Sequence, residues 1–131
     1  MSQENVEIVR RLIAALNARD LEGYLACCTE DVELHTPLEP FVGVYQRHDG
    51  IRQWFVDVED SAPDFHIDVL DVKAIGDRVL AFAHFDSSGR ASGIPTTGEI
   101  TNAYDLIGGK IKRVRVFADR AEALKAVGLE E

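Results

Sequence analysis

Residues 97–117 read TGEITNAYDLIGGKIKRVRVF, and this stretch decides the fold because it predicts a β-hairpin. The segments 97–106 and 110–117 carry the side-chain alternation of strands. Between them, Ile107-Gly108-Gly109 supplies glycine where a tight turn needs a positive φ. A further alternating segment, Phe65-His66-Ile67-Asp68-Val69, predicts another strand, so the second half of the chain forms a sheet.

The segments that precede this hairpin complete the sheet. After Val69 the apolar side chains change parity, which predicts a β-bulge. Residues 79–85 are apolar on both parities except at His84, so we expect a strand whose two faces are both covered. Turns are expected at 75–78 and at 87–90.

Helical periodicity appears on both sides of the strands. Apolar residues at helical spacing predict helices over residues 3–18 and 21–28, and a third helix after Asp49. A short strand, 32–35, separates the second helix from the third. The last helix has the capping pattern Asp119-x-x-Glu122 and ends at Gly128. Helices gathered beside a mainly antiparallel sheet predict an α+β fold in one domain, 1–131.

Composition narrows the classes of partner. The chain has 131 residues and a net charge of −9, from 14 Lys+Arg and 23 Asp+Glu, which argues against nucleic acid or an anionic membrane as a partner. No apolar run approaches the roughly 18 residues of a membrane helix, and we expect no signal peptide. Cys27 and Cys28 are neighbours and cannot form an ordinary disulfide, which fits a cytoplasmic location.

Three stretches resemble one superfamily. Residues 13–23, IAALNARDLEG, are similar to the first helix-turn-helix of nuclear transport factor 2-like proteins, and Gly50–Phe55, GIRQWF, resembles their third helix. Gly109–Ile111 together with Val116–Leu124 resembles the last strand and C-terminal helix of the SnoaL-like polyketide cyclase branch. The resemblance implies a cystatin-like cone, with a curved antiparallel or mixed sheet wrapped around the N-terminal helices, an apolar pocket, and a homodimer through the sheet.

The same fold hosts isomerases, cyclases, dehydratases and binding proteins, so function must be argued from the site. Among them, the ketosteroid isomerase is the nearest enzyme that can be aligned. The resemblance places Thr36 at the position of its aspartate base, Leu12 at that of its oxyanion tyrosine, and Asn102 at that of its second acid. Threonine is no base near neutral pH and leucine donates no hydrogen bond, so we expect no isomerase activity.

Strand parity decides which side chains face the pocket. If Leu34 and Thr36 face it, Glu33 and His35 face away, and the same argument excludes Asp86 and Glu99. A bulge would reverse such an assignment and leave His35 as a candidate base. The predicted inner wall consists of Leu12, Cys28, Leu34, Thr36, Trp54, Phe85, Asn102, Tyr104, Val114 and Val116.

The register of the hairpin stays open. A two-residue loop places Arg113 and Arg115 opposite Tyr104 and Asn102, which would make Arg115 an anion-binding group in the pocket. A three-residue loop sends both arginines to the other face, and we favour that alternative.

Three functions remain. The first is binding of a small apolar or aromatic molecule at Leu12, Cys28, Thr36, Trp54, Phe85, Asn102, Tyr104 and Val114. The second is an enzyme that isomerises, cyclises or dehydrates a cyclic or polyketide-like carbonyl compound. The third is a dimeric interaction module. A buried carboxylate or histidine of perturbed pKa that faces the cavity favours the enzyme, a cavity with only neutral groups favours binding, and a collapsed cavity favours the interaction module.

Two further expectations concern metals and the dimer. No cofactor is expected, and the four histidines lack the spacing of a metal site. Leu80 and Phe82 share one face of their strand, and we expect a second copy of the chain to cover that apolar face.

Overall fold

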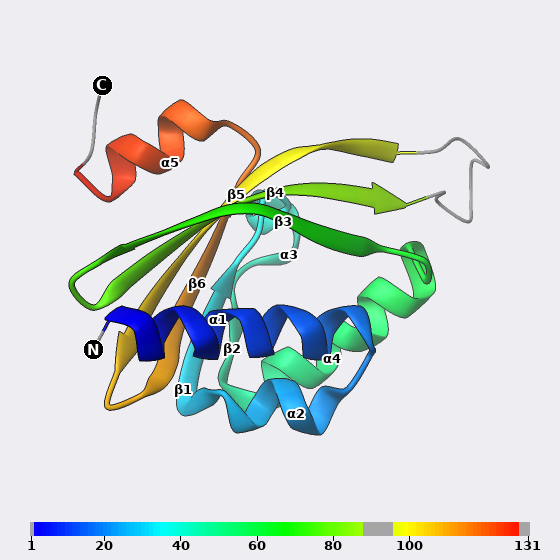
Figure 1. Cartoon of the computed structure of the whole chain (residues 1–131). Helices are drawn as coiled ribbons and strands as arrows, with labels where there is room; N and C mark the ends of the chain where they lie inside the picture. Colours follow the sequence, from blue (N-terminus) through cyan, green and yellow to red (C-terminus); the bar gives the residue numbers. More distant parts are fainter. Residues whose placement is uncertain (1, 88–95, 129–131) are drawn as a thin grey trace.

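The computed structural model describes residues 2–87 and 96–128, and a curved six-stranded sheet forms its centre (Figure 1). The helices are α1 (Ser2–Asn17), α2 (Leu21–Ala26), α3 (Glu39–Val42), α4 (Arg47–Ser61) and α5 (Arg120–Ala126). The strands are β1 (Cys28–His35), β2 (Tyr45–Gln46), β3 (His66–Ile75), β4 (Arg78–Ser87), β5 (Thr96–Ile107) and β6 (Lys110–Phe117). The α+β class predicted from the sequence is confirmed.

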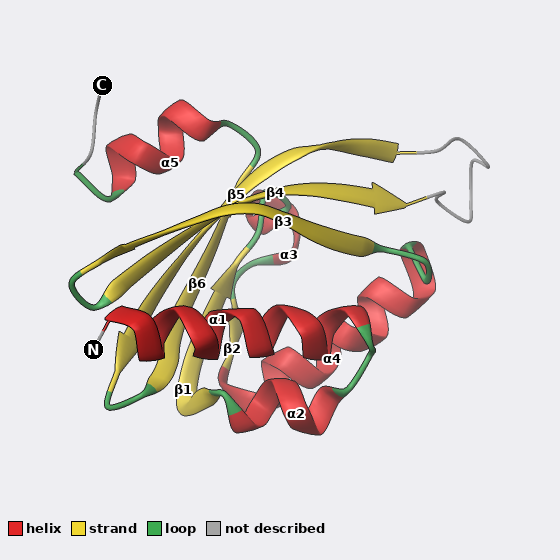
Figure 2. Cartoon of the chain, viewed as in Figure 1, coloured by secondary structure: helices red, strands yellow, loops and turns green. Residues whose placement is uncertain are grey.

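The strand order is β2-β1-β6-β5-β4-β3. Only the pairing of β1 with β6 is parallel, so the sheet is mixed and mainly antiparallel. Figure 2 shows α1, α2 and α4 on one side of the sheet and α5 on the other. Each face of the central strands therefore meets a helix, which explains why residues 79–85 are apolar on both parities.

Helix α1 packs its apolar stripe against the sheet. Val9, Leu12 and Leu16 lie on this stripe and are buried. At the end of the helix, the side chain of Asn17 is tied to the strand β3. Its Nδ2 donates to the carbonyl of Ile67 at 2.8 Å, and its Oδ1 accepts from the Ile67 amide at 2.9 Å. This pair of bonds fixes the distance between the end of α1 and β3 at Ile67.

The β5–β6 hairpin corrects one prediction. Ile107 pairs with Lys110, so the loop has two residues, Gly108 and Gly109, both with positive φ, and the favoured three-residue loop is wrong. A bulge next to Asp105 inserts one extra residue into β6. The side chains of β6 beyond the bulge therefore face the same sides of the sheet as a three-residue loop without a bulge would have placed them. Val114 and Val116 consequently lie opposite Tyr104 and Asn102. The bulge predicted after Val69 is confirmed by a register shift between Val69 and Asp71.

Helix α5 covers the outer face of the sheet. Leu80 and Phe82 are 0% and 8% exposed and pack with Leu124 and Val127, while the guanidinium of Arg120 lies 4.2 Å from the centre of the Phe82 ring. The expectation that a second copy must cover this apolar pair is therefore wrong, because the chain's own C-terminal helix does so. The capping residue Asp119 accepts a bond from the Ala121 amide at 2.8 Å, as its position predicted.

Several element boundaries differ from prediction. Helix α2 ends at Ala26, and Cys28 already belongs to β1. Helix α4 begins at Arg47, before the predicted cap Asp49. The short elements α3 and β2 were not predicted, and most of the turn expected at 87–90 lies outside the described residues. No helix in the described part of the chain is long and apolar enough to cross a membrane.

Candidate functional site

A cavity of about 480 Å³ lies between α1, α4 and the inner face of the sheet. Most of its wall is aliphatic or aromatic, as is usual for a small-molecule pocket. Pro37, Leu38 and Ser61 line it and are themselves exposed, so the cavity meets solvent between residues 37–38 and the end of α4. The lining residues are Leu12, Ile13, Leu16, Tyr24, Leu34, Thr36, Pro37, Leu38, Tyr45, Trp54, Asp57, Val58, Ser61, Ala62, Phe65, Ile67, Phe85, Ile100, Asn102, Tyr104, Val114 and Val116.

The structure brings most of the predicted wall together. Of the eight candidate ligand-binding residues, Leu12, Thr36, Trp54, Phe85, Asn102, Tyr104 and Val114 line this cavity. Leu34 and Val116 also do. The eighth, Cys28, does not, because it starts a strand instead of continuing the helix on which its placement was predicted.

The polar part of the inner wall is a pair of side chains on β5. Asn102 and Tyr104 are two residues apart on one face of the strand and are 3% and 2% exposed. Asn102 Nδ2 donates to the Tyr104 hydroxyl oxygen at 3.0 Å, and among the described residues Asn102 Oδ1 has no partner. Burial raises the pKa of Tyr104, so the hydroxyl stays protonated and can donate. Together the pair offers one acceptor and one donor to a ligand.

Aromatic rings form a second part of the wall. The ring of Trp54 lies 5.8 Å from that of Tyr24 and 5.7 Å from that of Phe55, measured between centroids. Trp54 is only partly buried although it belongs to this cluster, and one side of it faces the cavity. Phe65 and Phe85 stack at 6.1 Å on the opposite part of the wall. Such rings give a ligand large contact areas at a low cost in side-chain entropy.

Asp57 is a cavity residue that the sequence analysis missed. The hydroxyl of Tyr45 donates to Asp57 Oδ2 at 2.7 Å, and Gln53 Nε2 donates to Asp57 Oδ1 at 2.9 Å. Burial and the bond to Asp57 raise the pKa of Tyr45 to about 12. A Cβ on Gly50 would lie 2.9 Å from the Tyr45 backbone, so glycine is what lets α4 approach β2 this closely.

The carboxylates excluded by parity do lie outside the cavity. Glu33, Asp86 and Glu99 are absent from its wall. His35 also points away from it. Its Nε2 lies 3.0 Å from Glu33 Oε1 and its Nδ1 lies 2.8 Å from Glu39 Oε1. The alternative in which a bulge turns His35 into the base of the pocket is therefore wrong.

The arginines of β6, Arg113 and Arg115, surround the carboxylate of Asp105 on the outer face of the sheet. Asp105, 4% exposed, accepts from Arg113 Nε at 2.7 Å and from Arg78 Nε at 2.9 Å. Arg115 Nη2 lies 3.5 Å from the same carboxylate. The alternative that makes Arg115 an anion-binding group of the pocket is thereby ruled out.

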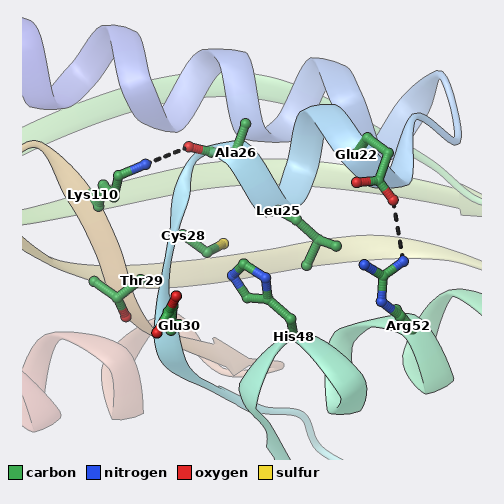
Figure 3. A pocket seen from close by; sticks show the side chains of 9 residues that line it. All are labelled: Glu22, Leu25, Ala26, Cys28, Thr29, Glu30, His48, Arg52 and Lys110. Carbon is green, nitrogen blue, oxygen red and sulfur yellow. Dashed lines mark hydrogen bonds and ion pairs between the residues drawn. The ribbon is translucent and has the colours of Figure 1, made fainter.

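Cys28 lines a second, more open hollow of about 420 Å³, drawn in Figure 3. Arg52 and Glu22 form an ion pair across it at 3.1 Å, and Lys110 donates to the Ala26 carbonyl at 3.0 Å. Burial raises the pKa of Cys28 to about 12, so its thiol stays protonated and unreactive. Two of its polar atoms, Thr29 Oγ1 and His48 Nε2, have no partner among the described residues. Most of its lining residues are nevertheless polar or charged, and Arg52 and Lys110 already have acceptors, so this hollow is the weaker candidate for an apolar ligand.

Metal binding finds no support among the side chains. Within residues 2–87 and 96–128, no group of three or more His, Cys, Asp and Glu side chains is placed to hold a metal ion.

Comparison with known proteins gives one family and many structures of the same fold. The model of the SnoaL-like domain matches residues 9–114. A search of functionally curated proteins gives no match. Three solved structures illustrate the similarity, and at these identities they show the fold alone.

A nuclear transport factor 2-like protein of unknown function from Burkholderia pseudomallei is 21% identical, with a TM-score of 0.81 over 93% of this chain and 95% of its own. TerC, co-crystallised with polyporic acid, is 22% identical, with a TM-score of 0.80 over 95% and 98%. A provisionally assigned SnoaL-like polyketide cyclase from a Jannaschia species is 17% identical, with a TM-score of 0.79 over 99% and 95%.

Proposed function

The chain belongs to the SnoaL-like domain family, and on that premise we propose that it binds a small apolar or aromatic molecule in the cavity between α1, α4 and the sheet. The ligand-binding residues of this proposal are Leu12, Thr36, Trp54, Phe85, Asn102, Tyr104 and Val114.

The observation that carries the proposal is the oxygen of Asn102, which lies in an apolar cavity and has no partner in the part of the chain that the structure describes. A buried polar atom without a partner costs about 1–3 kcal/mol, so a molecule that supplies the missing bond gains that much on binding. A ligand hydroxyl fits both groups at this point, because it can donate to Asn102 Oδ1 and accept from the Tyr104 hydroxyl.

The test compares 4-phenylcyclohexanol with phenylcyclohexane, which differ only in the hydroxyl group. Trp54 is the one tryptophan of the chain, so its fluorescence reports occupancy. We expect both compounds to change that fluorescence and the alcohol to bind about fivefold more tightly, the equivalent of one net hydrogen bond. Asn102→Leu should remove most of the preference for the alcohol. If neither compound binds up to its solubility limit, the proposed function is wrong.

A second candidate function, an enzyme acting on a cyclic or polyketide-like carbonyl compound, is supported by Asp57. A carboxylate on the cavity wall, held by Tyr45, can accept a proton from a carbon next to a carbonyl group. This is tested by incubating 4-phenylcyclohexanone with the protein in D₂O and following loss of the α-proton signals by NMR. Exchange above background that disappears in Asp57→Asn supports the enzyme, and exchange that survives in the variant counts against it.

Homodimerisation through the sheet also remains a proposal. Its support is the family, in which dimers are frequent. The apolar pair Leu80 and Phe82 no longer supports it, because α5 covers both side chains. Light scattering at micromolar concentration gives the mass directly, and a monomer would remove this part of the proposal.

A further inference from the structure

The charge of the cavity is carried by one residue. Among the described residues that line it, Asp57 is the only side chain with a formal charge, and all the others are apolar or neutral. We propose that the cavity selects a cation, namely a molecule with an apolar or aromatic body that bears an ammonium group, with Asp57 as its counterion. This inference rests on the proposed binding function and names the class of ligand.

The carboxylate is fixed in place and still has bonding capacity. Each oxygen of Asp57 accepts one hydrogen bond, Oδ2 from the Tyr45 hydroxyl and Oδ1 from Gln53 Nε2. A carboxylate accepts about four hydrogen bonds in total, so each oxygen keeps a free lone pair. The two neutral donors hold the group without neutralising it, and a bound ammonium group therefore meets a full negative charge.

No cation from residues 2–87 or 96–128 already pairs with Asp57. Among the described residues, Asp57 has no ion-pair partner. Arg19 lies near the same end of α4 but is used elsewhere, since it pairs with Glu59 and donates to the carbonyls of Pro63 and Phe65. The exposed Asp60, three residues beyond Asp57 on α4, adds negative charge to this end of the helix.

The surroundings strengthen the preference for a cation. Trp54 precedes Asp57 by three residues on α4, and both side chains line the cavity. The face of an indole ring attracts ammonium groups, most strongly where water is excluded. An apolar wall also weakens dielectric screening, so one carboxylate there repels anions and favours cations more than an exposed carboxylate would.

The experiment uses two molecules of nearly the same shape, phenyltrimethylammonium and tert-butylbenzene, which differ by one positive charge. Binding to the full chain is followed by Trp54 fluorescence and by NMR shifts of the ligand. We expect the cation to bind about five- to tenfold more tightly than the hydrocarbon, the equivalent of one partly desolvated cation contact. Asp57→Asn keeps the shape of the side chain and should remove most of this preference, leaving only the part that the Trp54 ring contributes. The matched control Asp60→Asn removes the same charge at an exposed site and should keep it.

The possible results separate the two proposals. Equal binding of the two molecules by the wild-type chain, or a preference that Asp57→Asn leaves undiminished, overturns the cation inference and leaves the proposed binding function standing. A preference lost equally in both variants assigns it to the general charge of the helix and also overturns the inference. Failure of both molecules to bind refutes the binding function together with the inference.

Discussion

The bond between Asn102 and Tyr104 yields a prediction that can be worked through in numbers. Tyr104→Phe removes the hydroxyl that accepts from Asn102 Nδ2 at 3.0 Å. The amide N–H is then left without a partner in a residue that is 3% exposed. The lost bond contributes about 1 kcal/mol and the new unpaired donor costs about 1–3 kcal/mol. We expect a loss of about 2–4 kcal/mol in the free energy of unfolding.

The second substitution should reverse this loss. Asn102→Leu removes the orphaned N–H and also the oxygen that has no partner among the described residues. Replacing both members of a buried polar pair by apolar groups of similar shape is nearly neutral or stabilising. The double variant should therefore be more stable than Tyr104→Phe alone by about 2 kcal/mol, although it carries one more substitution.

Urea unfolding of the wild type, both single variants and the double variant gives the coupling energy directly. A double variant no more stable than Tyr104→Phe would contradict the reasoning, because it would show that Asn102 has partners other than Tyr104. The same four proteins should be titrated with 4-phenylcyclohexanol. The double variant should lose the preference for the alcohol even if it is the most stable of the set.

Three other predictions follow from buried groups and from the cavity. Asp105→Ala leaves three arginines facing one another and should lower the free energy of unfolding by about 2–3 kcal/mol. This loss is smaller than for a fully buried ion pair, because two of the arginines keep over a third of their side chains exposed. The control is Asp86→Ala at an exposed site, and equal urea midpoints for the two variants would refute the prediction. Burial raises the pKa of Cys28 to about 12, so its thiol stays protonated below that pH. Cys28 should therefore react with a disulfide reagent at pH 8 far more slowly in the native chain than in urea. Labelling of native Cys28 at the rate of free cysteine would contradict this prediction. No turnover of a Δ5-3-ketosteroid is expected through the positions that the isomerase uses, since Thr36 is no base and Leu12 donates no hydrogen bond; turnover abolished by changing Thr36 or Asn102 would show that this reasoning is wrong, and turnover abolished by Asp57→Asn would instead support the second candidate function.

Patterns of period two predicted the sheet well, because each strand has one face that must be apolar. The alternation in β5 was enough to place Asn102 and Tyr104 on the cavity side. The hairpin loop was not predictable in the same way. A two-residue loop with a bulge and a three-residue loop without one give β6 the same facing, so apolar parity alone cannot tell them apart.

Two errors have a common physical origin in tertiary contacts. Cys28 fits the apolar face of a helix, but pairing of β1 with β6 draws it into a strand. Leu80 and Phe82 were correctly placed on the outer face, whereas the element that covers them lies about forty residues further along the chain. Asp57 could have been found, because it lies three residues after Trp54 and therefore on the same helical face. Strand parity applies only to residues on strands, so it gave no information about a carboxylate on α4.

The docking of α5 on the sheet decides where aggregation and proteolysis of the stored protein begin. Helix α5 has seven residues, too few to persist as an isolated helix in water, so it remains helical because it is docked on the sheet. Detachment of a short helix with few contacts costs less than unfolding the whole sheet. Such an event leaves the cavity and the hairpins in place but uncovers Leu80 and Phe82 on an otherwise folded sheet. Aggregation and proteolytic clipping during storage should therefore begin at this end of the molecule, in preparations that still bind ligand normally.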